Sequence, residues 1–369
     1  MRYNIKIIDL VFTITIFSQA FLGSYWSEIH TSLIWQACSY GLFALLGVIT
    51  FIEFVATSHT WQELLAFSFL ALMLLLFIFK KDINMILIFL FCAAGMLMSI
   101  ERILRVYLAG ISLGIVSVLL ACFFNILPLT NEEGLKSFGF VNPNTLGAYL
   151  FFAYAIFLLK CKHRFRVISV SMYFIFSVFI LFVLEDYTAF LMCSLFSILV
   201  LSARFEKNLL NLWIVKWILA FLPVALTYLT FWIAKNYYTY FWMVKLNDLF
   251  TSRPILWNFY YSNFPPTIFG TELPENIIFG HGAFDGAYIY YPIVHGILPF
   301  SIIMLILIAG TYMSAKQRNV FILIFLVVLI IFAFSEGIPF RVTQSPLLPI
   351  SVLVCVMGKR KEQLLNESR

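Results

Sequence analysis

Charged residues are scarce in this sequence: they make up 11% of 369 residues, whereas soluble domains carry roughly a quarter. The chain also lacks a Walker-type phosphate loop, a His-Glu-x-x-His motif, a Cys/His ligand set and a segment typical of a soluble nucleotide-sugar domain. These absences exclude a process driven by ATP hydrolysis, a zinc protease of the His-Glu-x-x-His type and a binding domain for a nucleotide-sugar donor. We therefore expect no metal and no cofactor, and a substrate drawn from the membrane or from outside.

The cysteines do not predict a disulfide framework either. The six cysteines lie in or beside apolar segments, and none lies in the long polar segment of the chain: Cys38, Cys92, Cys122, Cys161, Cys193 and Cys355. Their spacing predicts neither disulfides nor a metal site.

Hydrophobic residues, in contrast, are abundant, at 62% of the chain with a mean hydropathy of +0.97. Because about 20 apolar residues cross a bilayer core, the sequence predicts an all-α fold, a polytopic membrane helix bundle of about twelve spans. The expected spans lie near 5–22, 33–56, 64–80, 83–100, 106–127, 146–160, 167–184, 187–203, 210–233, 286–311, 319–335 and 346–358.

The net charge of +6 comes from short basic clusters between these runs, such as Lys160–Arg166 and Lys359–Lys361. Short loops rich in Lys and Arg stay cytoplasmic, so the clusters predict a multi-pass plasma-membrane protein with both termini inside, and nucleic-acid binding is not needed to explain them. Lys80 and Lys81 fall outside in this topology, which makes the part before Glu101 its least regular part.

This topology leaves three segments outside: 129–145, 234–285 and 335–345. It divides the chain into an N-terminal bundle (1–233), one large extracytoplasmic loop (234–285), and C-terminal helices with a short tail (286–369). We expect a functional site where the three outer segments meet the membrane.

Arg253 lies in the large loop, away from the cytoplasmic basic clusters. Its planar guanidinium suits bidentate binding of phosphate oxygens, and an interfacial Arg that reaches lipid headgroups is the alternative. Further along, His281, Asp285 and Tyr288 gather within ten residues at the entrance of a span. His281 or Asp285 is a candidate proton acceptor, whereas Asp285 as the N-cap of the next helix is the structural alternative.

The two other outer segments carry polar residues as well. Asn142 and Asn144 in Asn-Pro-Asn-Thr are typical of a helix start, whose N-terminus also suits an anion. Glu336 and Arg341 either pair with each other or contact a sugar or phosphate. Glu185 and Asp186 form another outer turn, to which no chemistry is assigned.

Taken together, three elements of this pattern resemble the bacterial O-antigen and capsular polysaccharide polymerases (Wzy-type), within the O-antigen ligase/polymerase superfamily. They are Gly139–Gly147, the Ser252-Arg253…Trp257 stretch, and Asp285-Gly-Ala-Tyr288 followed by Gly296. Two positions depart from the family. The turn that usually carries Ser-Arg-Ser/Thr reads Glu185-Asp186-Tyr187-Thr188, and Gly286 replaces the Asn of Asp-Asn.

The resemblance implies a glycosyltransferase that joins undecaprenyl-diphosphate-linked oligosaccharide units at the outer face of the membrane. It implies that Arg253 stabilises the leaving diphosphate with Arg341 as a second contact, and that His281 or Asp285 orients or deprotonates the acceptor. Sugar rings are expected on Tyr288, Trp257, Tyr260 and Tyr261, with Asn142 and Asn144 as further contacts. Expected partners are membrane lipid, a flippase and chain-length regulator proteins.

Two rival functions stay open. A ligase would move finished polysaccharide to another acceptor. His281 is compatible with this function, because the ligases of the resembled family tend to have a His-centred motif before the final spans. A lipid-linked oligosaccharide flippase or other transporter would place charged residues and broken helices near the membrane midplane, whereas the polar residues here are concentrated at the expected outer ends.

Overall fold

The computed structural model describes residues 6–29, 33–57, 59–132, 134–160, 165–206, 212–250, 252–274 and 284–367. Within these ranges the regular structure is helical, and backbone pairing of the β type is limited to the isolated bridges Ser24–Phe140 and Thr130–Lys136. The all-α fold expected from the sequence is confirmed.

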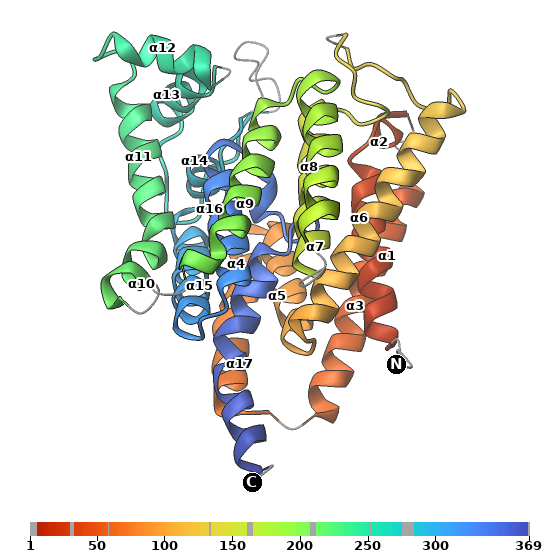
Figure 1. Cartoon of the computed structure of the whole chain (residues 1–369), viewed down its shortest axis with the longest axis vertical. Helices are drawn as coiled ribbons and strands as arrows, with labels where there is room; N and C mark the ends of the chain where they lie inside the picture. The colour runs from red at the N-terminus through yellow and green to blue at the C-terminus, as the bar shows by residue number, and fades with distance from the viewer. Residues whose placement is uncertain are drawn as a thin grey trace.

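A helix occupies each of the twelve apolar runs. The helices are α1 (Ile7–Leu22), α2 (Trp26–Ile29), α3 (Leu33–Ala56), α4 (Trp61–Lys80), α5 (Ile83–Met96), α6 (Ile100–Phe123), α7 (Pro143–Lys160), α8 (Phe165–Phe182), α9 (Tyr187–Glu206), α10 (Trp213–Ala220), α11 (Leu222–Asn236), α12 (Trp242–Leu249), α13 (Arg253–Asn263), α14 (Ala287–Val294), α15 (Ile297–Lys316), α16 (Val320–Ser335), the short 3-10 helix η2 (Ile338–Phe340) and α17 (Leu347–Glu367). Figure 1 shows most of them side by side in one bundle, with α12 and α13 at one end and the two termini towards the other. We call the α12–α13 end the upper end.

Several of these helices are long and apolar enough to cross a membrane. In the described part of the chain, four pass by length and composition: Ala37–Ala56, Trp61–Lys80, Ile100–Phe123 and Ile297–Lys316. α10 and α11 form a fifth if their 45° bend lies within one span. Six further apolar helices have only 10–17 residues, so the count of twelve spans is not confirmed and stays a prediction.

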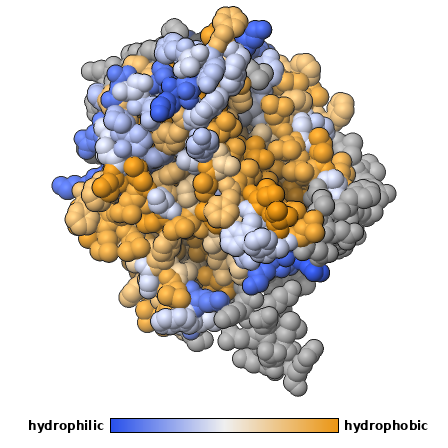
Figure 2. Space-filling view, turned by 90° about the vertical axis from the view of Figure 1, so that its left-hand side faces the viewer, coloured by the Kyte–Doolittle hydropathy of each residue, from blue (hydrophilic) through white to orange (hydrophobic). Residues whose placement is uncertain are grey.

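The surface agrees with a membrane environment. On the side of the molecule that carries α10 to α13, hydrophobic residues cover the middle, and hydrophilic residues gather mostly towards the upper end, with fewer at the lower end (Figure 2). Exposed apolar side chains such as Phe51, Phe79 and Ile218 have more than half of their surface accessible. Such a contiguous apolar surface is unusual for a soluble monomer and typical of lipid-facing helices.

The segment expected to be one large loop, 234–285, is largely helical where it is described. α11 extends into it as far as Asn236, and α12 and α13 follow before a non-helical stretch over 264–274. Asn247 fixes the start of α13, because its side-chain Oδ1 accepts from the Ile255 amide at 3.1 Å and its carbonyl accepts from Ser252. The N-terminal residue of α13 is Arg253.

The span expected over 286–311 is broken into α14 and α15. His295 and Gly296 separate the two helices, and Gly296 has φ = +105°, which favours glycine. The 264–274 stretch supplies backbone partners at the break: the Thr267 carbonyl accepts from the Ile297 amide, and the Thr271 amide donates to the Ile293 carbonyl. The broken helix is therefore satisfied by the chain segment that precedes it.

A tight turn separates α4 from α5. A capping box between Thr60 and Glu63 starts α4, which ends at Lys81 in the left-handed conformation (φ = +57°). Asp82 then caps α5, and its carboxylate accepts from the Asn84 amide at 3.0 Å. The sequence signals at this turn fix the position of Asp82.

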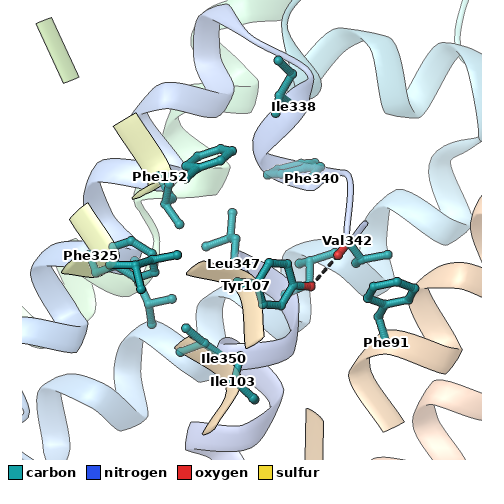
Figure 3. Packing of buried hydrophobic residues seen from close by; sticks show 14 of the residues in the cluster. Phe91, Ile103, Tyr107, Phe152, Phe325, Ile338, Phe340, Val342, Leu347 and Ile350 are labelled. Atoms are coloured by element: carbon teal, nitrogen blue, oxygen red, sulfur yellow. Dashed lines mark hydrogen bonds between the residues drawn. The ribbon is translucent and has the colours of Figure 1, made fainter. Parts of the chain in front are cut away.

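The connection between α16 and α17 is anchored in the hydrophobic core. Ile338, Phe340 and Val342 are buried, and the Tyr107 hydroxyl of α6 donates to the Val342 carbonyl (Figure 3). Since this connection holds Glu336 and Arg341, the core fixes both residues relative to α6 and α16.

Candidate functional site

Arg341 points away from the core because its neighbours point into it. Phe340 and Val342 are buried, and the extended backbone at Arg341 (φ −77°, ψ 101°) places its side chain on the opposite side, where it is exposed. In the described part of the chain, its guanidinium forms no ion pair and no hydrogen bond. Arg341 is thus an anchored but unpaired cation.

Arg341 lines a cavity of about 430 Å³ in the half of the bundle that faces the upper end. The walls come from α1, α3, α5, α14 and the α16–α17 connection, and include Gln19, Ser39, Asn84, Tyr290, Tyr291, His295 and Gln344. Amides, hydroxyls and aromatic rings around one unpaired cation suit a ligand that has hydroxyl groups and a negative charge. Phosphorylated or acidic carbohydrates are such ligands.

Arg253 lies in a buried ion cluster whose residues are not part of the cavity wall. Only 5% of the residue is exposed, and its Nη2 atom contacts the carboxylate of Glu336, which is 3% exposed. The same Nη2 atom lies 3.7 Å from Oδ2 of Asp285, whose side chain is 26% exposed. Nε of Arg253 is buried and has no hydrogen-bond partner in the described residues. We call Arg253, Asp285 and Glu336, with Asp186 described below, the Arg253 cluster.

A hydrogen bond from α13 holds Asp285 beside Arg253. The indole N–H of Trp257 donates to the Asp285 carbonyl at 2.8 Å. Gly286 follows at φ = +96°, and a Cβ there would lie 3.0 Å from the Trp257 ring nitrogen. Gly286 therefore replaces the Asn of the resembled motif at a position where the backbone requires glycine.

Asp186 joins the cluster from the α8–α9 turn. Its Oδ1 atom accepts from the Ala189 amide at 3.0 Å and so caps α9. Its Oδ2 atom lies against Gly147 of α7, where a Cβ would come within 2.1 Å. The turn that lacks the Arg of the resembled family thus brings a carboxylate towards Arg253 instead.

Burial dominates the electrostatics of these carboxyl groups. It raises the pKa of Asp186 to about 6, although the Ala189 amide and the Arg253 charge oppose the shift. Burial also raises the pKa of Asp285, against the charges of Arg253 and Arg341. For Glu336, burial and the charge of Asp285 raise the pKa well above the usual range, and Arg253 opposes them. Burial therefore disfavours the charged form of all three carboxyl groups around this one guanidinium.

The structure brings some of the predicted charged site residues together. Arg253 and Asp285 lie together, and Arg341 interacts electrostatically with Asp285 and Glu336. The pairing of Glu336 with Arg341, one of the two alternatives, is not observed, because Glu336 contacts Arg253. Asp285 does not cap α14 either: the helix begins after Gly286 and has no side-chain cap.

The predicted aromatic contacts lie mostly in the packed interior. Trp257, Tyr260 and Tyr288 are buried, and the Tyr288 hydroxyl donates to the Ile330 carbonyl at 2.9 Å. Tyr261 is half-buried and packs edge-on against Phe231. None of these four rings lines the cavity, so sugar binding by them stays a prediction without support from their positions.

Two further predicted residues, Asn142 and Asn144, lie elsewhere. Asn142 caps α7, because its Oδ1 atom accepts from the Asn144 amide at 2.8 Å, and both residues are half-buried and lie outside the cavity wall. His281 falls within 275–283, outside the described residues.

Sequence reasoning did not single out Asp82, Tyr290, Tyr291 or His295, and it left Asp186 without a role. A signal was present for one of them: His295 is an imidazole inside an apolar run, and ionisable residues there are rare and often functional. Nothing in the local sequence indicates that Asp186 faces Arg253, because the two residues belong to different hairpins.

No group of three potential His, Cys, Asp or Glu metal ligands occurs within the described ranges. In comparisons with protein-family models, curated proteins and solved structures, the chain matches none of them. The geometry of the site and the short motifs are therefore the features that indicate a function.

Proposed function

We propose that this chain is a polysaccharide polymerase, a membrane glycosyltransferase that joins undecaprenyl-diphosphate-linked oligosaccharide units into longer chains. The observation that carries the proposal is Arg341, an unpaired guanidinium anchored at the wall of a 430 Å³ cavity rich in amides, hydroxyls and tyrosines. A guanidinium there would bind the diphosphate of the donor and stabilise the negative charge that develops as it leaves.

The lining of the cavity supports a glycan as the remaining ligand. Tyr290 and Tyr291 offer aromatic faces, and Gln19, Asn84 and Gln344 offer amides that pair with sugar hydroxyls. α3, which contributes to the cavity wall, also carries exposed apolar side chains outside the cavity, such as Leu45 and Val48, along which a polyprenyl chain can lie.

In this proposal the Arg253 cluster has an indirect role. Because its guanidinium is buried against Glu336, Arg253 is less suited to a direct diphosphate contact than Arg341. It holds Asp285 and Glu336 at the side of the site and sets the local electrostatic field. The leaving diphosphate is thus assigned to Arg341 first, which reverses the order expected from the sequence.

The test is complementation of a deletion strain in the native host. Wild type and Arg341→Lys, Arg341→Ala and Lys316→Ala variants are expressed at matched membrane levels, and the glycan is resolved by size. Wild type and Lys316→Ala, which removes an exposed cation at the lower end, should restore a full ladder. Arg341→Ala should leave single repeat units. Arg341→Lys should restore short chains, because Lys keeps the positive charge but lacks the planar guanidinium that binds two phosphate oxygens at once.

Arg253→Ala is a weaker test of the chemistry. Removing one partner of a buried ion pair costs about 3–5 kcal/mol, so this variant is expected to reduce the amount of folded protein. A full ladder from a well-expressed Arg341→Ala variant would contradict the proposed diphosphate contact. Long chains that are no longer attached to their acceptor would instead identify a ligase.

The break between α14 and α15 favours a second candidate, a transporter of lipid-linked oligosaccharide. Discontinuous helices with polar residues at the break are typical of transporter binding sites, and His295 lies at this break. If the deletion strain lacks even single repeat units outside the membrane, and wild type restores them, transport replaces polymerisation as the proposed function.

A further inference from the structure

The helix break holds a buried imidazole beside a carboxylate. His295 is 3% exposed, and its Nδ1 atom contacts Oδ2 of Asp82 at the α4–α5 turn. Asp82 is itself held in place, since its Oδ1 atom accepts from both the amide and the side-chain nitrogen of Asn84 at 3.0 Å. The pair joins two segments that are 213 residues apart in the sequence.

The contact with Asp82 determines what the other nitrogen of His295 can do. A carboxylate that accepts from Nδ1–H fixes the tautomer in which Nε2 has the lone pair. Nε2 has no hydrogen-bond partner among the residues that the structure describes, and His295 lines the cavity with Arg341. Asp82 therefore orients the imidazole through Nδ1, and Nε2 on the other side of the ring has no partner in the described residues.

Several ionisable groups surround His295. Asp82 is in contact, and Arg341 and the rings of Tyr290 and Tyr291 share the cavity wall, with ring centroids 5.5 Å and 4.7 Å from His295. Lys80 interacts electrostatically with both Asp82 and Glu272. Burial raises the pKa of Asp82, but the hydrogen bond and charge of His295 and the Asn84 contacts outweigh it and bring the pKa below its ordinary value. Asp82 is thus ionised across the neutral range.

We propose that Asp82 and His295 form the proton-accepting pair of the cavity and that His295 Nε2 takes the proton of the acceptor sugar hydroxyl. This inference rests on the proposed polymerase function. The acceptor oxygen forms a bond to the anomeric carbon of the donor while the bond from that carbon to the diphosphate oxygen breaks. The lipid diphosphate leaves as an anion against Arg341, and the proton on His295 passes to water.

The position of the pair favours it over Asp285 as the proton acceptor. His295 and Arg341 line the same cavity, whereas Asp285 is not part of its wall and lies 3.7 Å from the Arg253 guanidinium. An acceptor hydroxyl bound in the cavity can therefore reach His295 without disturbing a buried ion pair. Asp285 is left with a positioning role through Arg253.

The test uses the purified full-length protein in lipid nanodiscs, a lipid-diphosphate-linked repeat unit as substrate, and the initial rate of chain extension from pH 5 to 9. His295→Gln should lower kcat by about 100-fold or more, the contribution of a general base, and leave KM within about twofold. The wild-type rate should fall towards acid pH, because a protonated imidazole cannot accept a proton, and that fall should be lost in His295→Gln.

Asp82→Asn should also lower kcat, because the amide no longer fixes the productive tautomer. The matched control is His59→Gln, which changes a histidine that pairs with Glu63 near the opposite end of α4 and should leave the pH profile unchanged. Size-exclusion and thermal melting of each variant establish that it is folded.

The outcomes separate this inference from the function on which it rests. If the wild-type protein does not extend the lipid-linked unit at any pH, the proposed function fails. The proton-acceptor role is overturned, and polymerisation stands, in either of two cases. In the first, wild type is active but its rate does not fall towards acid pH. In the second, folded His295→Gln keeps kcat within tenfold of wild type. Should His295→Gln not fold, the wild-type acid limb and Asp82→Asn decide the question.

Discussion

Asp186 has a carboxylate that only a glycine on the neighbouring helix leaves room for. It caps α9 with one oxygen and places the other against Gly147, where any larger residue would collide with it. Burial then disfavours its charge and raises its pKa to about 6. The same residue thus contributes a helix cap, which stabilises the fold, and a buried ionisable group, which costs stability when it is charged.

The cost of this charge predicts the pH dependence of stability. Because the folded pKa of Asp186 is about 6 and the reference value is 3.8, the folded state binds the proton more tightly. The contribution of Asp186 to the free energy of unfolding is greatest below about pH 4 and is lost as the pH rises to about 6 and above, by up to about 3 kcal/mol. Asp186→Asn keeps a capping side chain and removes this loss.

We therefore expect the melting temperature of Asp186→Asn in detergent to fall less than that of wild type between pH 4.5 and 7.5. Intrinsic fluorescence during heating measures it. Asp248→Asn, at an exposed position on α12, is the control and should follow wild type. Parallel curves for wild type and Asp186→Asn would show that the carboxyl group titrates normally.

Among the elements, the α1–α6 pair depends on small residues. A Cβ on Gly114 would lie 2.4 Å from the Ala20 Cβ, and one on Gly110 would lie 2.7 Å from the Ile16 Cβ. Two glycines four residues apart let helix backbones approach closely in a membrane. At the lower end of the pair, Arg102 bonds Asp9 at 2.5 Å. This packing holds α6, whose Tyr107 anchors the α16–α17 connection that carries Arg341.

Gly114→Leu should separate α1 from α6 and destabilise the protein by about 1–3 kcal/mol, the usual cost of overpacking. The measurement is the melting temperature and the monodisperse fraction after solubilisation. Gly41→Leu, on α3 where a Cβ meets no atom within 4 Å, is the matched control and should behave as wild type. Equal melting temperatures for the two variants would contradict close packing at Gly114.

At the scale of the whole molecule, residues from the N-terminal and C-terminal parts of the chain line one cavity. Gln19 comes from the first helix and Gln344 from the connection before the last. The upper ends of α1 and α3, the α4–α5 turn and the broken α14–α15 helix must all be in place before the cavity exists. Site variants in any of these elements therefore affect one common feature.

The arrangement predicts which loops share a side of the membrane. A Cβ on Gly270 would lie 2.3 Å from the Lys80 amino group, so the α4–α5 turn and the 264–274 stretch lie at one level. In a variant without native cysteines, Lys81→Cys and Glu272→Cys should react with a membrane-impermeant maleimide in intact spheroplasts. Lys316→Cys, in the last turn of α15 at the lower end, should react only after permeabilisation. Opposite-side labelling of Lys81 and Glu272 would refute this arrangement.

Much of the fold could be predicted from the sequence, and less of the site. Hydropathy and caps predicted the helical runs, since these are local properties, and Asn142 was expected to cap the helix that it does cap. The break at His295 and Gly296 was not predicted, because an apolar run conceals a backbone bend. Arg253, Asp285 and Arg341 were singled out as candidates from residue type and position, but their pairing was not predicted, because a charge in the sequence does not reveal its partner.

By itself, the sequence determined the all-helical class, the approximate bounds of the helices and the scarcity of charge that makes each charged residue informative. Only the tertiary structure decided that Arg253 meets Glu336, 83 residues away, and that Asp82 meets His295. The physical reason is that helix formation depends on neighbours within a few turns, whereas a buried ion pair depends on how distant helices pack and exclude water.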